Sequence, residues 1–341
     1  MIDRVSRKIV RTTALFAEAF GFEMVRVKPS GSKQPSIRFI RPVSGGGAPK
    51  PVFRANGMAE TNRYFTVNVD CYAGIKHMKS ALALLIKESV SLNRTPVVFT
   101  PKLLSSHNFG KEVNASWDKY LDLDKIAITQ NGTTHRVKAV KRDVIADIDA
   151  FAVLEVKGKH FVTATENAEY QLIVKNNSSG LGFENVYGHD DFDFDVELCP
   201  SHVVLDHADH VIPQLGQYHS MHVRRGDKLA EKERYPNLDR DTRPETIYDT
   251  VSRVLPRGSR IYILTDERTP NYFDVLGKDY QIFQYFDFPE LRHLVEGAHP
   301  DNFLLYEIEQ VVFAQAKTRI YTFADPSGKH RISLTSDVGW T

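Results

Sequence analysis

The chain has 341 residues, 42% of them hydrophobic and 26% charged, which is enough to bury the cores of two ordinary domains. Lys and Arg number 44 against 43 Asp and Glu, and this balance argues against a dedicated nucleic-acid-binding protein, which needs a basic surplus. Two cysteines exclude a disulfide framework, and no apolar run approaches the ~20 residues that span a bilayer. We therefore expect a cytoplasmic protein without a transmembrane segment, with the secretory lumen as the alternative if the N-terminus is trimmed.

Residues 1–58 contain Gly-, Ser- and Pro-rich runs, "PSGSKQPSIRF" and "VSGGGAPKP", which predict an irregular N-terminal extension. Regular structure is expected to begin with the strand "RYFTVNVDCY". After a turn at Gly74, Met78, Leu82 and Leu85 recur at helical spacing in "KHMKSALALLIKESVSL". The apolar run "TPVVF" then indicates a buried strand. A strand, helix and strand of this length predict a βαβ unit with parallel strands.

Residues 124–200 are richer in strand-like segments, and we predict strands at "HRVKAV", "DAFAVLEV", "HFVTAT", "EYQLIV" and "DFDFDVEL". From residue 217 strands and helices alternate, as "YHSMHV", "PETIYDTVSRVL", "RIYILTD", "YQIFQYF", "DNFLLYEIEQVVFAQAK" and "RIYTF". We expect an α/β protein with two doubly wound domains, 59–205 and 206–341, that face each other across a ligand-binding cleft.

A dense cluster of charge follows the strand in "MHVRRGD". Ligands of open parallel sheets bind beyond the carboxyl ends of the strands. Gly226 permits a tight turn there, and the guanidinium groups of Arg224 and Arg225 can each hold two phosphate oxygens. We predict that the two arginines together bind a diphosphate and that Asp227 orients one of them. The alternative is a surface ion-pair cluster.

A second acidic position ends a later strand of the same predicted domain. Asp266 lies in "LTDERTP", where it either lines a ribose site or caps a helix.

Three peptides, in order, resemble a known family. "HVRRGDK" is similar to the HxRRxD/K peptide of the fucosyltransferases that use GDP-fucose, which include the α1,6, α1,2 and protein O-fucosyltransferases. "LNRTPVVFTPKLLSSHNF" and "SWDKYLDL" resemble the family's first-domain peptides. "LLYEIEQVVFAQAKTRIYTF" resembles its last helix and strand. The resemblance covers residues 64–123 and 217–330.

The resemblance implies a GT-B fold of two Rossmann-like domains, a first domain on the acceptor side and a second that binds the GDP-sugar. It implies an inverting transferase that moves fucose from GDP-fucose to a hydroxyl of a glycan or protein, with no metal and no further cofactor. No nucleic-acid partner is implied. The alternatives are a GT-B enzyme that uses another nucleotide sugar, and a catalytically inactive module that binds a glycan or partner.

The resemblance also implies roles for single residues of the second domain. Arg224 would bind the β-phosphate and His222 would approach the guanine or ribose. Glu309, thirteen residues before Thr322, would pair with the guanine edge. The full predicted donor site is His222, Arg224, Arg225, Asp227, Asp266, Glu309, Thr322, Ser327 and Gly328.

The chain departs from the family pattern at two places. Where relatives carry a Gly-Asn-Gln turn, this chain has Lys76 and His77 shortly after Gly74, and we include these three in a first-domain site. Relatives of the α1,6 type carry a catalytic glutamate eight residues after the first arginine, which is Lys232 here. The general base, expected to act with Arg224, is therefore one of its neighbours, Glu231 or Glu233.

Overall fold

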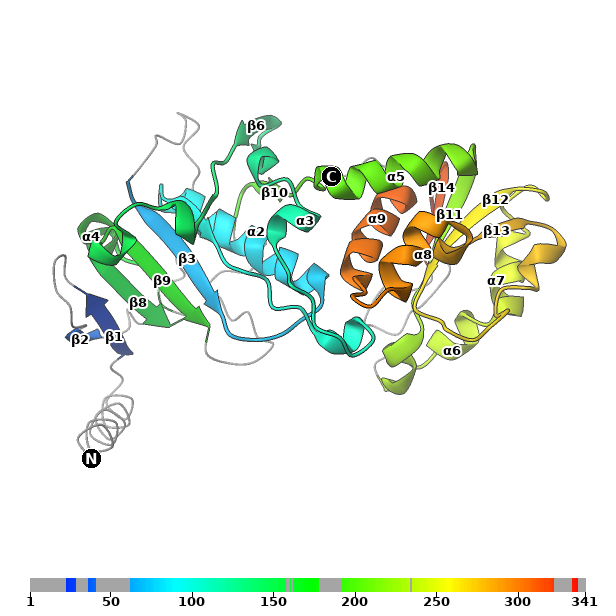
Figure 1. Cartoon of the computed structure of the whole chain (residues 1–341), viewed down its shortest axis with the longest axis horizontal. Coiled ribbons are helices and arrows are strands. Elements are labelled where there is room, and N and C mark those ends of the chain that lie inside the picture. The colour runs from blue at the N-terminus through cyan, green and yellow to red at the C-terminus, as the bar shows by residue number, and fades with distance from the viewer. Residues whose placement is uncertain are drawn as a thin grey trace. The chain divides into compact units, whose positions relative to one another are not determined.

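A computed structural model of the chain describes residues 23–28, 36–40, 62–157, 160, 162–177, 192–233, 235–321 and 333–336. They form two compact units (Figure 1). The first unit comprises residues 1–105 and 114–199, and the second comprises residues 106–113 and 200–341. The domain boundary predicted after residue 205 lies inside helix α5 (His202–Leu215), and the structure divides the chain just before this helix.

The first unit is built on a seven-stranded sheet with the order β2-β1-β8-β9-β3-β4-β7. The last five strands in this order run parallel to one another. The strand bounds are β1 (Glu23–Lys28), β2 (Ser36–Ile40), β3 (Tyr64–Val69), β4 (Thr95–Val98), β7 (Val140–Lys141), β8 (Val153–Lys157) and β9 (Leu172–Asn177).

Strands β1 and β2 correct the prediction that residues 1–58 are irregular. They pair antiparallel with each other, and β1 pairs antiparallel with β8. Each strand is only five or six residues long and lies beside loop-like runs in the sequence. The partner β8 is far away along the chain, so no local pattern indicated this pairing.

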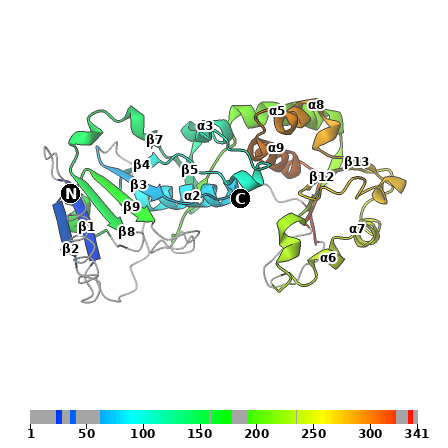
Figure 2. The same cartoon turned by 60° about the horizontal axis from the view of Figure 1, so that its bottom comes forward.

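Helix α2 (Ile75–Ser91) follows β3 and packs against β3 and β4 (Figure 2). Met78, Leu82 and Leu85 are fully buried, which confirms the predicted apolar face. Strands β3 and β4 are parallel neighbours, so the predicted βαβ unit is also confirmed.

Smaller elements complete the first unit. They are the antiparallel sheet β10-β5-β6, with β5 (Ala127–Gln130), β6 (Thr133–Arg136) and β10 (Asp195–Glu197), and the helices α3 (Trp117–Tyr120) and α4 (Ala164–Glu169). The strand predicted at "HFVTAT" is wrong because α4 begins there. The Thr163 hydroxyl accepts from the Glu166 amide and the Glu166 carboxylate accepts from the Thr163 amide, which is a capping box.

The second unit contains a five-stranded sheet with the order β13-β12-β11-β14-β15. In this order the first four strands run parallel to one another, and β15 is antiparallel to β14. The strand bounds are β11 (Tyr218–Val223), β12 (Arg260–Thr265), β13 (Gln281–Phe283), β14 (Thr318–Tyr321) and β15 (Ser333–Ser336). The α-helices are α5, α6 (Leu238–Asp241), α7 (Pro244–Val251), α8 (Pro289–Glu296) and α9 (Asn302–Ala314).

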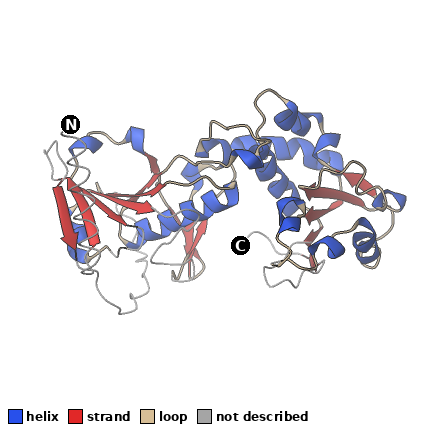
Figure 3. Cartoon of the chain, turned by 90° about the horizontal axis from the view of Figure 1, so that it is seen from below, coloured by secondary structure: helices blue, strands red, loops and turns tan. Residues whose placement is uncertain are grey.

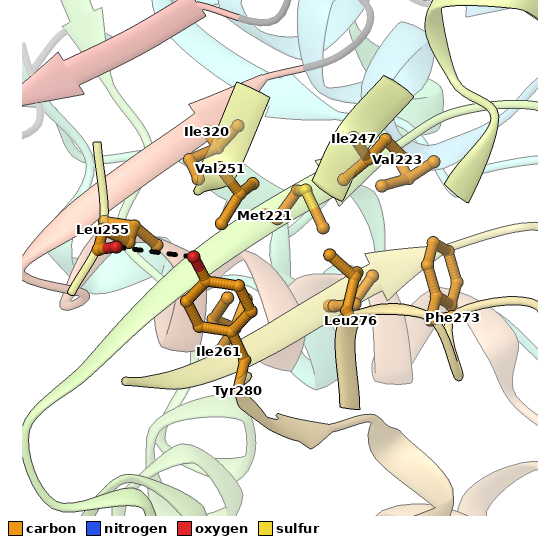
Figure 4. Packing of buried hydrophobic residues seen from close by; sticks show 11 residues of the cluster. Met221, Val223, Ile247, Val251, Leu255, Ile261, Phe273, Leu276, Tyr280 and Ile320 are labelled. Atoms are coloured by element: carbon orange, nitrogen blue, oxygen red, sulfur yellow. Dashed lines mark hydrogen bonds between the residues drawn. The ribbon is translucent and has the colours of Figure 1, made fainter. Parts of the chain in front are cut away.

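Helices cover both faces of this sheet. Helix α9 contacts β11, β12, α5 and α8 on one face, and α6 and α7 lie on the other (Figure 2). Figure 3 shows helices on both sides of the strands. The face toward α7 carries a compact apolar cluster (Figure 4). There Met221 and Val223 of β11 pack with Ile247 and Val251 of α7. The side chains at odd-numbered positions of β11 therefore face α7.

Both units are mixed α/β with parallel strands, as the sequence predicts. In the part of the chain that the structure describes, no helix combines the length and the apolar character needed to cross a bilayer.

Candidate functional site

The carboxyl end of β11 is the place in the second unit where the topology favours a ligand. From β11 the chain adds β12 and β13 on one side and then β14 on the other. Ligands of open α/β sheets bind outside the carboxyl ends of the strands at such a reversal. Arg224 is the first residue after β11, so the predicted charge cluster lies at this reversal.

The two arginines point to opposite faces of the sheet. Successive side chains of a strand alternate between faces, so Arg225 continues the row of Met221 and Val223 toward α6 and α7. Arg224 continues the row of His222, whose ring lies edge-on to Phe313 of α9, with 6.4 Å between ring centroids. Adjacent positions therefore cannot form the paired clamp that we predicted.

Arg225 is buried and bonded within the chain, an arrangement that does not favour its predicted role in donor binding. Its Nε donates to Glu267 at 2.8 Å and its Nη2 donates to Asp239 at 2.9 Å. Nη1 donates to the Thr242 hydroxyl at 2.5 Å and to the Asp239 carbonyl at 3.3 Å. The guanidinium also lies 4.9 Å from the centre of the Tyr272 ring. Four of the five N–H groups are thus used, and the side chain is only 8% exposed.

Arg224 remains partly open to solvent, with 26% of its side chain exposed. Its Nη2 lies 2.5 Å from Asp227 Oδ1 and its Nη1 is paired with Asp266 Oδ2. Asp227 thus makes the contact expected of a residue that orients an arginine. Arg224 is accordingly the guanidinium of the predicted pair that an anion can reach.

Asp266 holds the end of β11 together. One carboxylate oxygen pairs with Arg224, and the other accepts from the backbone amide of Arg225 at 2.7 Å. Gly226, at φ +21°, makes this possible because a Cβ there would collide with the Asp266 carboxylate. The helix-capping role that we considered for Asp266 is not formed, because a turn and not a helix follows β12, and in this turn Glu267 accepts from the amides of Arg268 and Thr269.

Carboxylates pair with the cations at this strand end. Among the described residues, the ion pairs join four cations to five carboxylates: Arg224, Arg225, Lys228 and Arg243 to Asp227, Glu231, Asp239, Asp266 and Glu267. The cluster is therefore an ion-pair network rather than a bare cationic patch. An anion that binds Arg224 must compete with two carboxylates for its N–H groups.

The two candidate bases differ in their surroundings. Glu231 pairs with Lys228, whose ammonium also lies 3.5 Å from Asp227. Glu231 is thereby linked through Lys228 and Asp227 to Arg224. Glu233 is exposed to solvent.

Glu309 does not lie at the strand end. Its carboxyl is buried between α9 and β12, where it accepts from the Tyr262 hydroxyl at 3.0 Å. Burial raises the pKa of Glu309 to about 8, although the hydrogen bond from Tyr262 opposes the rise. A neutral, buried carboxyl that is bonded to Tyr262 is not presented to a nucleotide, so the predicted guanine contact is not formed by this arrangement. Thr322, Ser327 and Gly328 lie outside the described residues.

The first-unit residues that we predicted lie at the start of α2. Gly74 is the N-cap of this helix, with φ −66° and ψ 155°, and Lys76 and His77 are exposed in its first turn. They follow the carboxyl end of β3.

A loop that the predictions missed presents an aromatic ring near Arg224. Residues 106–113 belong to the second unit, and buried Asn108 anchors them. Asn108 Oδ1 accepts from the Asn302 amide at 2.8 Å, and its Nδ2 donates to the Pro300 carbonyl at 2.8 Å. The next residue, Phe109, has a positive φ of 55° and is 42% exposed.

The Arg268 guanidinium lies 4.7 Å from the centre of the Phe109 ring. Arg268 is two residues beyond Asp266, a separation of at most about 7 Å along the chain. Because Asp266 contacts Arg224, the ring belongs to the same end of the sheet. The signal in the sequence was "NFG", a turn that places an aromatic residue before a glycine.

No protein-family model matches this chain, and no curated protein matches it significantly. Among the described residues, no group of three or more His, Cys, Asp or Glu side chains could hold a metal ion. That the reaction needs no metal stays a prediction.

Proposed function

We propose that this protein is an inverting glycosyltransferase that transfers fucose from GDP-fucose to a hydroxyl of a glycan or protein, without a metal. The observation that carries the proposal is Arg224, a partly exposed guanidinium at the reversal point of a parallel sheet. The three peptides that resemble the fucosyltransferases, in their family order, give it its substrate.

The two units would then be the Rossmann-like domains of a GT-B enzyme. The order of the parallel strands in the second unit supports this. Numbered along the chain, β13-β12-β11-β14 is the order 3-2-1-4, which is one side and the centre of the dinucleotide-binding sheet.

Arg224 would act on the leaving group. Cleavage of the bond between the sugar and the diphosphate places negative charge on the β-phosphate oxygens. A guanidinium already positioned there stabilises this charge more in the transition state than in the ground state, and loss of one such donor costs ~10²–10³-fold in turnover. Asp227 and Asp266 hold Arg224 in place until the diphosphate takes over its N–H groups.

Glu231 and Glu233 remain the candidates for the base that removes the acceptor proton. Phe109 and Arg268 are the described residues best suited to stack on the nucleobase, because a ring and a guanidinium both offer flat faces.

Two observations favour alternatives. Burial of Glu309 removes the predicted reader of guanine, which favours a GT-B enzyme that uses another nucleotide sugar. The pairing of Arg224 with two carboxylates favours an inactive glycan- or partner-binding module. Calorimetry with GDP, UDP and ADP separates the first alternative, and release of GDP from GDP-fucose separates the second.

The decisive variant is Arg224→Lys, which keeps the charge and loses the planar fork. We expect weaker GDP binding and a turnover of GDP-fucose lower by ~10²-fold. Arg257→Lys is the matched control, since Arg257 is 80% exposed and lies elsewhere in the same unit. Activity should persist in EDTA. Equal turnover in Arg224→Lys and the wild type would remove Arg224 from the mechanism.

A further inference from the structure

The first unit has its own reversal point, which lies between β3 and β9. From β3 the chain adds β4 and β7 on one side, and β8 and β9 then fill the other side. Both strands are parallel and pair in register from Tyr64↔Leu172 to Val69↔Asn177. By the same topological rule, a ligand of this sheet is expected near the carboxyl ends of β3 and β9.

A cavity of about 610 Å³ lies over one face of this sheet. Lys175 of β9 points to the opposite face, where it pairs with Glu88 of α2 at 2.7 Å. Because side chains alternate, Val174 and Asn176 face away from α2 and line the cavity. The cavity is therefore on the side of the sheet that α2 does not cover.

Polar side chains form a row across three neighbouring strands in this cavity. Asn68 Nδ2 of β3 donates to Asn176 Oδ1 of β9 at 3.1 Å, and Asn176 Nδ2 lies 3.5 Å from Glu155 Oε2 of β8. Asn68 and Asn176 are register partners, so the backbone pairing fixes their approach. Each amide has two N–H groups and two acceptor positions, so donors and acceptors remain for a ligand. Parallel strands are usually apolar on both faces, so this row calls for a reason beyond packing.

Most of the other lining residues are apolar, and the net charge of the lining is small. Val97, Val153, Leu172 and Val174 form an apolar area beside the polar row, and Phe99 lies at the end of β4. The charged lining residues are Arg142, Asp149 and Glu155, which sum to −1 at neutral pH. That balance disfavours an anionic ligand. Amides, a carboxylate and apolar area together suit a molecule that carries hydroxyl groups and C–H faces.

We propose that this cavity binds a neutral carbohydrate, and that this carbohydrate is the acceptor of the transfer. The assignment of this carbohydrate as the acceptor rests on the proposed function, whereas the binding of a carbohydrate does not. The amide row would bind sugar hydroxyls, and the valine and leucine side chains would contact the C–H face of the ring.

The test is binding of the full chain to an array of neutral, sialylated and sulphated oligosaccharides. Asn68→Leu and Asn176→Leu keep the side-chain volume and remove the hydrogen-bonding groups. We expect the wild type to bind neutral glycans and each variant to bind them ~10-fold or more weakly. Asn114→Leu, an exposed position of the same unit outside the cavity, should bind as the wild type does. Asn68 is exposed, so its variant should fold even if Asn176→Leu does not.

Glu155→Gln tests the charge separately. It keeps an acceptor and removes the negative charge, so neutral glycans should still bind, whereas sialylated ones should gain. The proposal is overturned if the wild type binds no glycan on the array, binds only acidic glycans, or binds neutral glycans equally well after both asparagine substitutions.

Failure of the proposed function has a different signature. All of these variants should bind GDP as the wild type does, because their positions lie in the other unit. A wild type that binds neutral glycans but neither binds GDP nor cleaves GDP-fucose would leave the carbohydrate site standing and identify the chain as a binding module.

Discussion

The two reversal points use the same geometry for different chemistry. At β11 the residue that faces the candidate site is Arg224, and its neighbour Arg225 is buried in ion pairs behind the sheet. At β9 the facing residue is Asn176, and its neighbour Lys175 is buried in an ion pair with Glu88. Strand alternation produces both arrangements. Under the two proposals, the topology would set where each ligand binds, and the facing side chain would decide whether an anion or a neutral molecule is favoured.

The buried pair behind β9 should be the most sensitive part of this arrangement. Lys175 and Glu88 have side chains only 2% and 3% exposed. In Lys175→Met the Glu88 carboxylate loses its counter-ion in the interior, and we expect a loss of about 3–5 kcal/mol in the free energy of unfolding. Urea unfolding at pH 7 measures this loss of free energy. The loss should be smaller at pH 5, because burial already raises the pKa of Glu88 and a protonated carboxyl needs no counter-ion.

The double variant Lys175→Met with Glu88→Leu serves as the control. It removes both charges and should recover most of the stability. If the single and the double variant lose equal stability, the pair does not explain the effect.

The pair of arginines at β11 should separate stability from binding. Arg225→Met removes one charged partner from Glu267 and one from Asp239, and these carboxylates keep Thr269 and Arg243 as partners. We expect about 2–3 kcal/mol less stability, since Asp239 is also half exposed and can hydrate. Arg224→Met should cost less than about 1 kcal/mol, because Asp227 is half exposed and Asp266 keeps the backbone amide of Arg225 as a partner. Urea unfolding measures the stability of each variant, and calorimetric titration measures its binding of pyrophosphate. Only the Arg224 variant should lose pyrophosphate binding while folded, and the reverse pattern would contradict the assignment.

Local pattern was sufficient for much of the fold. The elements β3, α2, β4, β11, β12 and α9 begin and end within a few residues of the predicted segments, because each carries a strong apolar period. The failures involve weaker or more distant signals. β1 depends on β8, far along the chain, and the capping signal Thr163…Glu166 at α4 was read as part of a strand. The short helix α8 was not predicted.

Local pattern was less informative about the site. It correctly placed Arg224 and Asp227 at a strand end, but the alternation that separates Arg224 from Arg225 was available in the sequence and was not applied. The burial of Glu309 was not available, because it depends on Tyr262 of a strand far along the chain. The contact between Asn68 and Asn176 likewise depends on a pairing between segments that are distant in sequence.

Behind the β11 site, Glu309 should make the stability of the chain depend on pH. Its folded-state pKa of about 8 is above its ordinary value of 4.5, so between these values the folded protein holds a proton that the unfolded chain releases. Stability from this group is therefore lost as pH rises from about 4.5 to 8, by at most ~1.4 kcal/mol per pH unit. Glu309→Gln stays neutral and can still accept from Tyr262.

The variant should thus gain stability over the wild type as pH rises, by about 2 kcal/mol at pH 6 and about 4 kcal/mol at pH 8, in urea unfolding at half-unit steps of pH. Parallel pH profiles for the two proteins would show that the carboxyl does not hold its proton. Glu296→Gln, at the end of the neighbouring helix α8, serves as the control because the Glu296 side chain is 63% exposed.

The smallest expected effect concerns the Phe109 ring, which lies at the same end of the sheet as Arg224, and tests the proposal that this end binds a nucleotide rather than any anion. Phe109→Ala removes the exposed ring that Arg268 covers, and we expect GDP to bind about fivefold more weakly. Pyrophosphate, which has no base to stack, should bind as before. Phe109→Asn is the control for the backbone, because asparagine tolerates the positive φ at this position, and it should weaken GDP binding equally. Equal losses for GDP and pyrophosphate would mean that the loop supports the fold around Arg224 and does not contact the base.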